Sequence, residues 1–477
     1  MSRGYLPHRL AASLIAFALT GGAGPPSRFA EAAPPEPVST GPLRIHPENR
    51  RYFTDGTGKA IYLAGSHTWF SIQGPDAAPE RSAAFVDFIK SRGHNFTRVW
   101  SFYSYLIATP DSPDNTLMSP WPYLRTGPGT AADGGAKFDL TKPDPTYVER
   151  LRAFVRQARD RGIFCSIMLF GSYNQIRDKK FTNSSWHRGN NINPETSLLS
   201  TGSDFFEMFP DVLALQEAHV RHVIDALNEF DNIMWEVMNE AMDAPNASAW
   251  HHHILKVIRT YEATKPKQHL TGMTGGPDRS GAGQMSLSGA DFVSPDNGTP
   301  GDYKNGGPAA YTGKVVLNDV DHLWGVSYDE ALIRAWVWKT FTRGHHALFM
   351  EDRRVMNAAP LQSDDRIRYA LGHTVNYSRR LDLARTTPRS DLSSTGYALA
   401  DPGAEYLVYQ PGSGAFTVNL TAGRYDFEWF DPVDGVVSAT GTLRAATGDY
   451  TFVPPLAGEA VLYLKSAPPA FGIGSSK

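Results

Sequence analysis

Hydrophobic and polar residues follow a repeating pattern along the middle of the chain. Between residues 60 and 352, short apolar runs alternate with longer segments that carry apolar residues at three- and four-residue spacing. Buried strands followed by amphipathic helices around a parallel sheet produce this pattern. Eight runs are predicted to be strands, at residues 60–67, 95–102, 163–171, 232–240, 269–275, 291–297, 314–322 and 347–352.

The segments between these runs carry the signals of helices. Helices are predicted at residues 79–92, 144–161, 211–230, 246–264 and 327–343. Asp144-Pro145 is a typical helix start, and Gly93 and Gly162 each follow a basic last turn. The fifth and sixth repeats are short and rich in glycine, so their helices are the weakest part of the pattern. Eight strands predict an α/β fold, a (β/α)8 TIM barrel. An open doubly wound sheet is the alternative, but no glycine-rich phosphate loop follows the first strand.

The pattern changes after a long amphipathic stretch at residues 362–384. Segments at 405–409, 414–420, 424–430 and 460–464 alternate apolar and polar residues and are separated by Gly, Pro and Asp. This pattern predicts a small antiparallel β-sandwich domain. We place the catalytic barrel at residues 43–388, the sandwich at 389–466 and a tail at 467–477.

The first residues have the features of an export signal. Arg3, His8 and Arg9 precede the apolar stretch 10–19, and the small-residue run 29–33 follows as a cleavage site. A membrane anchor is the alternative, but this stretch is shorter than the roughly 20 residues that span a bilayer. We therefore expect a signal peptide at 1–33, a disordered spacer at 34–42, and a secreted or periplasmic mature protein.

Composition narrows the choice of partner. The chain has 46 basic and 49 acidic residues and a net charge of −3, so no overall field attracts nucleic acid or a membrane surface. Aromatic residues make up 12% of the chain, which suits stacking against sugars but also suits a large core. The single cysteine, Cys165, excludes internal disulfides and lies in an apolar run, where a buried inert thiol is expected. The oligomeric state has no signal in the sequence.

Polar residues gather at the carboxyl-terminal ends of the predicted strands, where barrel enzymes place their active sites. They include Glu236 to Glu240 on strand four and Asn318 to His322 on strand seven. Glu351 and Asp352 end strand eight. Glycoside hydrolysis needs two carboxyl groups on either side of the scissile bond. Strands four and seven both offer such groups.

The run at 232–240, ending Glu-Val-Met-Asn-Glu, resembles the clan of retaining (β/α)8 glycosidases that includes the cellulase and β-galactosidase families. In that clan an Asn-Glu pair closes strand four. The resemblance implies that Glu240 is the catalytic acid/base and that Asn239 binds the hydroxyl beside the anomeric carbon. The clan also carries an arginine on strand two, which Arg98 matches. Glu236 lies deeper on the same strand face, where a structural ion pair or hydrogen bond is expected.

The second carboxylate departs from that clan. The clan has a glutamate at the end of strand seven, whereas this chain offers Asp319 and Asp321, which share one strand face. Aspartate is shorter, so either the backbone approaches the sugar or a water lies between, as in an inverting enzyme. Counting from Lys314 slightly favours Asp319, and Asp321 remains the alternative.

A second resemblance covers most of the chain beyond the signal. Residues 51–69, 397–402 and 429–432 look like the apiosidase-like hydrolases, in which a barrel precedes a small β domain often labelled as collagen-binding. No residue of this chain supports the collagen label, and specificity for apiose does not follow from common ancestry.

Hydrogen-bonding and stacking residues lie at the strand ends and in a long polar loop at 174–203, which is expected to form one wall of a cleft. The predicted substrate-binding residues are His67, Trp69, Arg98, Trp100, Tyr103, Trp186, His187, Asn190, Asn191, Asn239, His322 and Trp324.

The predicted function is a secreted glycoside hydrolase that cleaves O-glycosidic bonds of a neutral plant or microbial glycan, without cofactor or metal. One alternative is a metal-dependent barrel hydrolase that uses Asp319, Asp321 and His322. Such barrels usually carry His-x-His after strand one, where this chain has only His67. The other alternative is a non-catalytic carbohydrate-binding protein, against which Asn239-Glu240 argues.

Overall fold

Eight parallel strands form a closed barrel in the order predicted from the apolar runs. The computed structural model describes residues 39–75, 77–104, 106–109, 112–171, 178–239, 244–275, 288–294, 313–319, 329–351, 355–356 and 364–467. The barrel strands are β3 (Ala64–His67), β4 (Phe96–Val99), β9 (Phe164–Gly171), β10 (Ile233–Asn239), β11 (Thr271–Thr274), β12 (Phe292–Ser294), β13 (Val315–Asp319) and β14 (His346–Met350). Each strand coincides with one predicted run, so the predicted fold class is confirmed.

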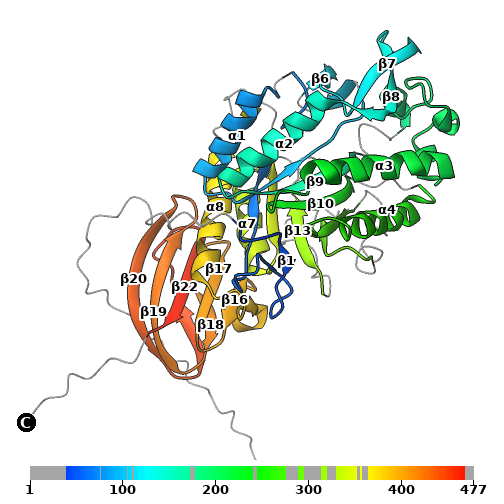
Figure 1. Cartoon of the computed structure of the whole chain (residues 1–477). Coiled ribbons are helices and arrows are strands. Elements are labelled where there is room, and N and C mark those ends of the chain that lie inside the picture. Colours follow the sequence, from blue (N-terminus) through cyan, green and yellow to red (C-terminus); the bar gives the residue numbers. More distant parts are fainter. Residues whose placement is uncertain are drawn as a thin grey trace, which may run out of the picture.

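Helices surround this barrel (Figure 1). They are α1 (Pro79–Ser91), α2 (Pro145–Asp160), α3 (Pro210–Leu227), α4 (Ala247–Glu262), α7 (Glu330–Thr342) and α8 (Asp365–Arg380). The predicted helix start at Asp144 is correct, because its side chain accepts a hydrogen bond from the amide of Thr146 at 2.8 Å. Gly93 and Gly162 end α1 and α2 with positive φ angles of 83° and 68°, which glycine adopts without strain. The glycine-rich fifth and sixth repeats fall largely outside the described residues.

The inside of the barrel changes from apolar to polar along its axis. At the amino-terminal end, Phe96, Met234, Phe292 and Leu348 belong to one buried apolar cluster. A short hairpin of β1 (Arg44–Ile45) and β2 (Phe53–Thr54) adds Leu43 and Phe53 to this cluster. Because side chains alternate along a strand, the inward residues that follow are Arg98, Glu236, Ser294 and Asp319. The carboxyl-terminal half of the barrel therefore holds charged groups.

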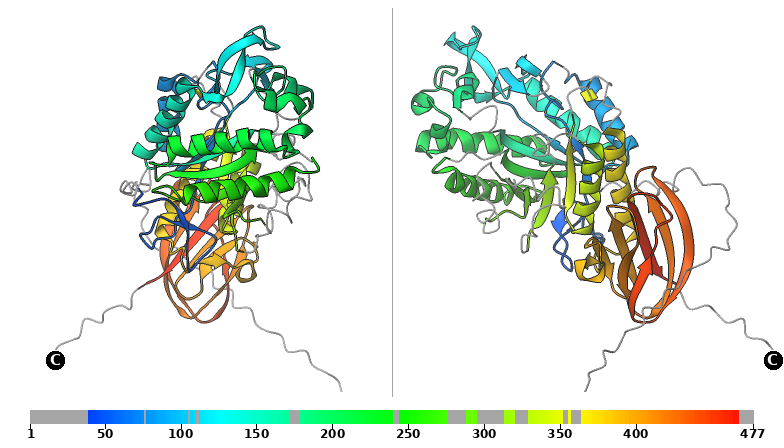
Figure 2. Two further views of the ribbon diagram at one scale, coloured as in Figure 1. Left: turned by 45° about the vertical axis from the view of Figure 1, so that its right-hand side comes forward. Right: turned by 180° about the vertical axis from the view of Figure 1, so that it is seen from behind.

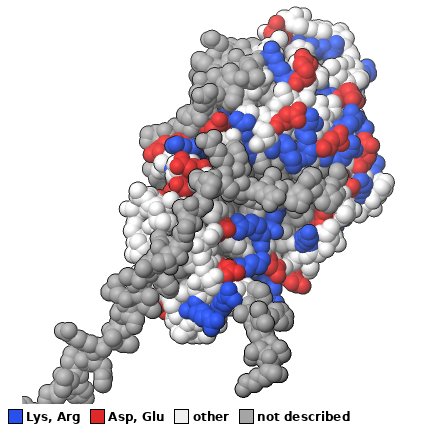
Figure 3. Space-filling model, turned by 90° about the vertical axis from the view of Figure 1, so that its left-hand side faces the viewer, with Lys and Arg blue, Asp and Glu red and all other residues white. Residues whose placement is uncertain are grey.

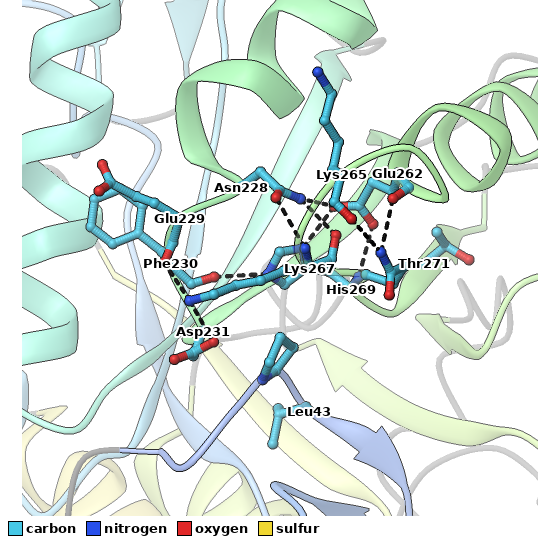
Figure 4. A network of polar contacts seen from close by, with 12 residues as sticks. Leu43, Asn228, Glu229, Phe230, Asp231, Glu262, Lys265, Lys267, His269 and Thr271 are labelled. Carbon is cyan, nitrogen blue, oxygen red and sulfur yellow. Dashed lines mark hydrogen bonds and ion pairs between the residues drawn. The ribbon is translucent and has the colours of Figure 1, made fainter.

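A polar network joins the helix ends at the amino-terminal face (Figure 4). His269 is buried, and its Nδ1 and Nε2 lie 2.7 Å from Glu262 Oε1 and 2.8 Å from the Phe230 carbonyl. Glu262 also accepts hydrogen bonds from the His269 amide at 2.8 Å and from Asn228 at 3.2 Å. These contacts connect the end of α3, the end of α4 and the start of β11.

Two long connections rise from the carboxyl-terminal ends of β4 and β9. The first forms hairpins of β5 (Leu106–Thr109) with β6 (Ser112–Leu117) and of β7 (Tyr123–Thr130) with β8 (Ala136–Pro143), which the sequence pattern did not predict. The second contains the short helices η1 (Asp178–Asn183), η2 (Pro194–Leu198) and η3 (Ser203–Phe206). Phe138 of β8 exchanges backbone hydrogen bonds of 2.9 Å with Asn190 and Ile192. The two connections therefore form one packed unit.

The C-terminal domain is the predicted antiparallel β-sandwich. Its larger sheet has the order β15 (Thr387–Pro388), β16 (Ala398–Asp401), β17 (Glu405–Gln410), β22 (Ala460–Ser466), β19 (Gly423–Asp431) and β20 (Val436–Ala445). The smaller sheet pairs β18 (Phe416–Leu420) with β21 (Gly448–Phe452), and the short helix η7 spans Ser390–Leu392. Tyr406, Val408 and Trp429 face the smaller sheet and share a separate core with it.

The other face of the larger sheet packs on α7 and α8 of the barrel (Figure 2). Trp338 of α7 stacks on Tyr409 with ring centroids 6.1 Å apart. Arg334 of α7 forms a buried ion pair with Glu459, and Arg380 of α8 lies 2.6 Å from Glu428. Apolar packing and ion pairs thus bind the two domains together.

Charges on the described surface are mixed in sign. Basic and acidic side chains are interspersed on the face that Figure 3 shows. Arg161 of the turn after α2, for example, pairs with Asp87 of α1 at 2.5 Å. Cys165 is a buried free thiol, as predicted, and burial raises its pKa well above the usual range. Among the described helices, none is both long and apolar enough to cross a membrane.

Candidate active site

A buried arginine links four barrel strands at the carboxyl-terminal half of the barrel. Arg98 of β4 has no exposed side-chain surface, and its Nε and Nη2 lie 2.7 and 2.9 Å from the two carboxylate oxygens of Glu236 on β10. Its Nη1 contacts Oδ2 of Asp319 on β13, and its Nη2 donates to the Ser294 hydroxyl of β12 at 3.1 Å. Burial alone would lower the pKa of Arg98, but the two carboxylates raise it overall, so this guanidinium stays charged.

The two carboxylates differ in depth. Glu236 lies in the middle of β10 with no exposed side-chain surface, whereas Asp319 is the last residue of β13 and its side chain is 11% exposed. Glu236 therefore serves as the deep partner of Arg98, as its position four residues before Glu240 suggested. Asp319 is the carboxylate nearer the mouth of the barrel.

Two further predicted residues join Asp319. His67 is the last residue of β3, and its Nε2 lies 3.6 Å from Asp319 Oδ2. Its Nδ1 accepts a hydrogen bond of 3.1 Å from the indole N–H of Trp100. The two rings are nearly parallel, with an interplanar angle of 3°. Trp69 lies tilted against Trp100 with ring centroids 5.9 Å apart. The structure thus brings together residues that are distant in the sequence.

The end of strand four is described up to Asn239, which is the last residue of β10 and is 3% exposed. Glu240 follows it directly in the sequence and lies outside the described residues, as do Asp321, His322 and Trp324. Their predicted roles therefore remain predictions.

The loop residues predicted to contact a sugar lie within the unit formed by the two long connections. Trp186 is only 1% exposed and packs edge-on against Tyr123 and Phe205. In this structure Trp186 therefore has almost no exposed surface, and its predicted contact with a sugar stays a prediction. Tyr103 is also buried, and its hydroxyl lies 2.6 Å from Nε2 of His219.

The polar residues of this loop hold its own backbone. Asn191 donates to the carbonyls of Ser185 and His187 at 2.9 and 3.1 Å. Asn190 donates to the carbonyls of Thr182 and Ser184 at 2.7 and 2.8 Å. The His187 ring is only partly buried, and burial together with Arg188 lowers its pKa. The side-chain amides of Asn190 and Asn191 are therefore used within the loop, and His187 is the partly exposed member of this group. Their predicted contacts with a sugar stay predictions.

A second buried ion pair was not anticipated. Glu351 follows β14 directly, and Arg368 of α8 donates to its carboxylate through Nε at 2.8 Å and Nη2 at 2.6 Å. Burial raises the pKa of Glu351 despite these contacts. In the sequence, the available signal for this ion pair was the position of Arg368 on the apolar face of the amphipathic stretch at 362–384. Glu351 is thus occupied as a structural partner.

Metal binding has no site among the described residues, where no group of three His, Cys, Asp or Glu side chains could hold an ion. Of the three residues that the metal-dependent alternative uses, Asp319 belongs to the described residues, whereas Asp321 and His322 do not.

Comparison with known proteins supports this architecture. A family described as "Domain of unknown function (DUF6298)" matches residues 118–280, which include all of β10. None of the curated proteins matches the chain. A solved structure described as "Glycoside hydrolase" is 12% identical with a TM-score of 0.59, covering 90% of this chain and 98% of its own. A glycoside hydrolase family 5 structure from Bacteroides vulgatus is 12% identical with a TM-score of 0.58, covering 89% and 94%. At such identities the likeness shows the fold alone.

Proposed function

We propose that this protein is a glycoside hydrolase that cleaves an O-glycosidic bond with Glu240 as acid/base and Asp319 as the second carboxylate. The observation that carries the proposal is the position of Asp319 at the carboxyl-terminal end of β13, where Arg98 and His67 both approach its Oδ2. A cation beside a carboxylate favours the ionised form, which a nucleophile or a general base requires. The similarity of the fold to glycoside hydrolases supports the same reaction class.

Glu240 is proposed as the acid because of its place in the chain. It follows Asn239 at the carboxyl-terminal end of β10, and parallel strands end on the same side of a barrel. Strand four and strand seven therefore direct their last residues toward one mouth. A carboxylic acid there can protonate the leaving oxygen while the carboxylate of Asp319 attacks the anomeric carbon or activates a water.

The proposed substrate is a neutral plant or microbial glycan. The net charge of −3 and the mixed surface charges do not favour a strongly anionic polymer. The proposed route of the chain is export to the periplasm or the medium, with a mature protein that begins near Ala33. Mass spectrometry of the exported protein tests this route, and an intact Met1 would contradict it.

Azide rescue tests the second carboxylate. The Asp319→Ala variant should fail to hydrolyse even activated aryl glycosides of neutral sugars, because the attacking group is gone. If the enzyme retains configuration, azide should restore turnover and give a glycosyl azide of inverted configuration. If it inverts, the first product anomer seen by NMR with the wild type should be opposite to the substrate.

The matched variant is Asp321→Ala, which should keep turnover of the activated substrate. Full activity of Asp319→Ala together with an inactive Asp321→Ala would assign the second carboxylate to Asp321 instead. Activity of the wild type that is lost in chelator and restored by a divalent ion would favour the metal-dependent alternative.

A further inference from the structure

The pairing of Trp100 with His67 fixes where His67 carries its proton. An indole N–H can only donate, so Nδ1 of His67 must accept the 3.1 Å hydrogen bond with its lone pair. The proton of the neutral imidazole is then on Nε2. The other tautomer, or an imidazolium, would set two N–H groups against each other. The planes of the two rings are nearly parallel, with an angle of 3° between them.

The Nε2–H group of this tautomer lies near Asp319, the candidate second carboxylate. It lies 3.6 Å from Asp319 Oδ2, and the His67 side chain has no exposed surface. Nε2 is buried and makes no hydrogen bond with the described part of the chain. A buried donor without a partner is costly and calls for an explanation. The distance exceeds the hydrogen-bond range of about 2.7–3.2 Å by only about half an ångström.

Trp100 is better placed to hold His67 than to stack on a sugar. Its side chain is buried, with 4% of the residue exposed. His67 lies parallel to its ring, and Phe102 is stacked at 6.3 Å with an interplanar angle of 18°. The indole ring therefore has little exposed surface, and its N–H is used within the chain.

We propose that Trp100 and His67 are positioning residues that orient Asp319 for catalysis. Trp100 fixes the tautomer, and the Nε2–H of His67 hydrogen-bonds to Oδ2 of Asp319 when substrate closes the site. Hydrogen bonds of catalytic groups are often long without substrate and shorten in the complex. Arg98 of β4 and His67 of β3 then both contact Oδ2 of Asp319. These two contacts fix the rotation of the carboxylate and keep it ionised. The catalytic part of this inference rests on the proposed function, whereas the tautomer and the contact do not.

NMR on the full chain tests the tautomer without any substrate. Ring-¹⁵N histidine labelling should show His67 with a protonated Nε2 and an unprotonated Nδ1, and its signals are identified by their loss in His67→Gln. Trp100→Phe keeps an aromatic ring but removes the donor, so it should produce a mixture of tautomers. Trp338→Phe removes the indole N–H of a buried tryptophan in α7 and should leave the His67 signals unchanged. A His67 ring protonated on Nδ1 would overturn the inference.

The contact with Asp319 is tested through its own carboxyl signal. With ¹³C-labelled aspartate, the signal that disappears in Asp319→Asn should shift in His67→Leu and stay in place in Trp338→Phe. An Asp319 signal that is insensitive to His67→Leu would overturn the positioning role, even if the tautomer is as expected.

Kinetics separate positioning of Asp319 from binding of a sugar hydroxyl. His67→Leu, which has no donor, should lower kcat about 10-fold or more with KM within about twofold. His67→Gln places an amide N–H within reach and should recover most of kcat. A rise in KM at unchanged kcat would show that His67 binds substrate instead. If no glycoside is hydrolysed by the wild type while the NMR results hold, the proposed function fails and the contact between His67 and Asp319 stands.

Discussion

Removing Glu236 should destabilise the barrel strongly, because Arg98 would lose its deepest partner. Both side chains have no exposed surface and are joined by contacts of 2.7 and 2.9 Å. Breaking a buried ion pair by removing one partner typically costs about 3–5 kcal/mol. Asp319 still neutralises Arg98 in the variant, so we expect Glu236→Leu to lose about 3 kcal/mol of unfolding free energy, at the lower end of that range.

Urea unfolding followed by tryptophan fluorescence measures this loss. The matched control is Glu149→Gln on α2, whose partner Arg156 lies 3.7 Å away with both side chains exposed by 43% or more. An exposed pair of this kind contributes about 0–1 kcal/mol. The control should therefore unfold close to the wild type.

A double variant sharpens the test. Arg98→Met combined with Glu236→Leu removes the buried charge together with its deep partner, so the double variant should lose less than the sum of the two single losses. A loss for Glu236→Leu no larger than that of Glu149→Gln, or losses that simply add, would refute the reasoning that Arg98 depends on Glu236.

Three further outcomes follow from buried polar groups. Burial lowers the pKa of His94 from 6.5 to about 4 and that of His345 to about 3, so the folded state resists protonation. The unfolded state binds these protons below about pH 6.5 and the folded state does not, so the free energy of unfolding should decrease as the pH falls from 6.5 toward 4. A constant Tm over that range would contradict this. Glu459→Gln weakens the pair with Arg334 and should expose the segment between the two domains to protease, whereas unchanged digestion would argue against a role in docking. Asn190→Ala removes hydrogen bonds of 2.7 and 2.8 Å and should increase proteolysis of the loop at 178–209 at unchanged global Tm.

Periodicity predicted the barrel well because the strands are short, continuous apolar runs that any solvent-shielded parallel sheet requires. The hairpin of β7 and β8 escaped prediction. Its residues 123–143 are rich in Gly, Thr and Pro, and its pairing is completed by Asn190 and Ile192, about 50 residues away. Local patterns carry no signal of such a contact.

The candidate site was predictable only in outline. The rule that barrel sites lie at strand ends selected His67, Arg98 and Asp319, which the structure brings together. The sequence could not separate Trp100, which hydrogen-bonds to His67, from Trp186, which is buried in the long connection after β9. Both are tryptophans in segments that follow a barrel strand, and only long-range packing distinguishes them.

The most direct test of the account is the leaving-group dependence of Glu240→Gln. Two glycosides of the same sugar are compared, one with an alkyl or sugar leaving group and one with a dinitrophenyl group. Because general acid catalysis contributes typically about 10²- to 10⁴-fold, kcat/KM for the first should fall by that factor. For the second, which needs no proton, kcat/KM should change little. Wild-type rates on both substrates, or equal losses on both, would contradict the assignment of Glu240 as the proton donor.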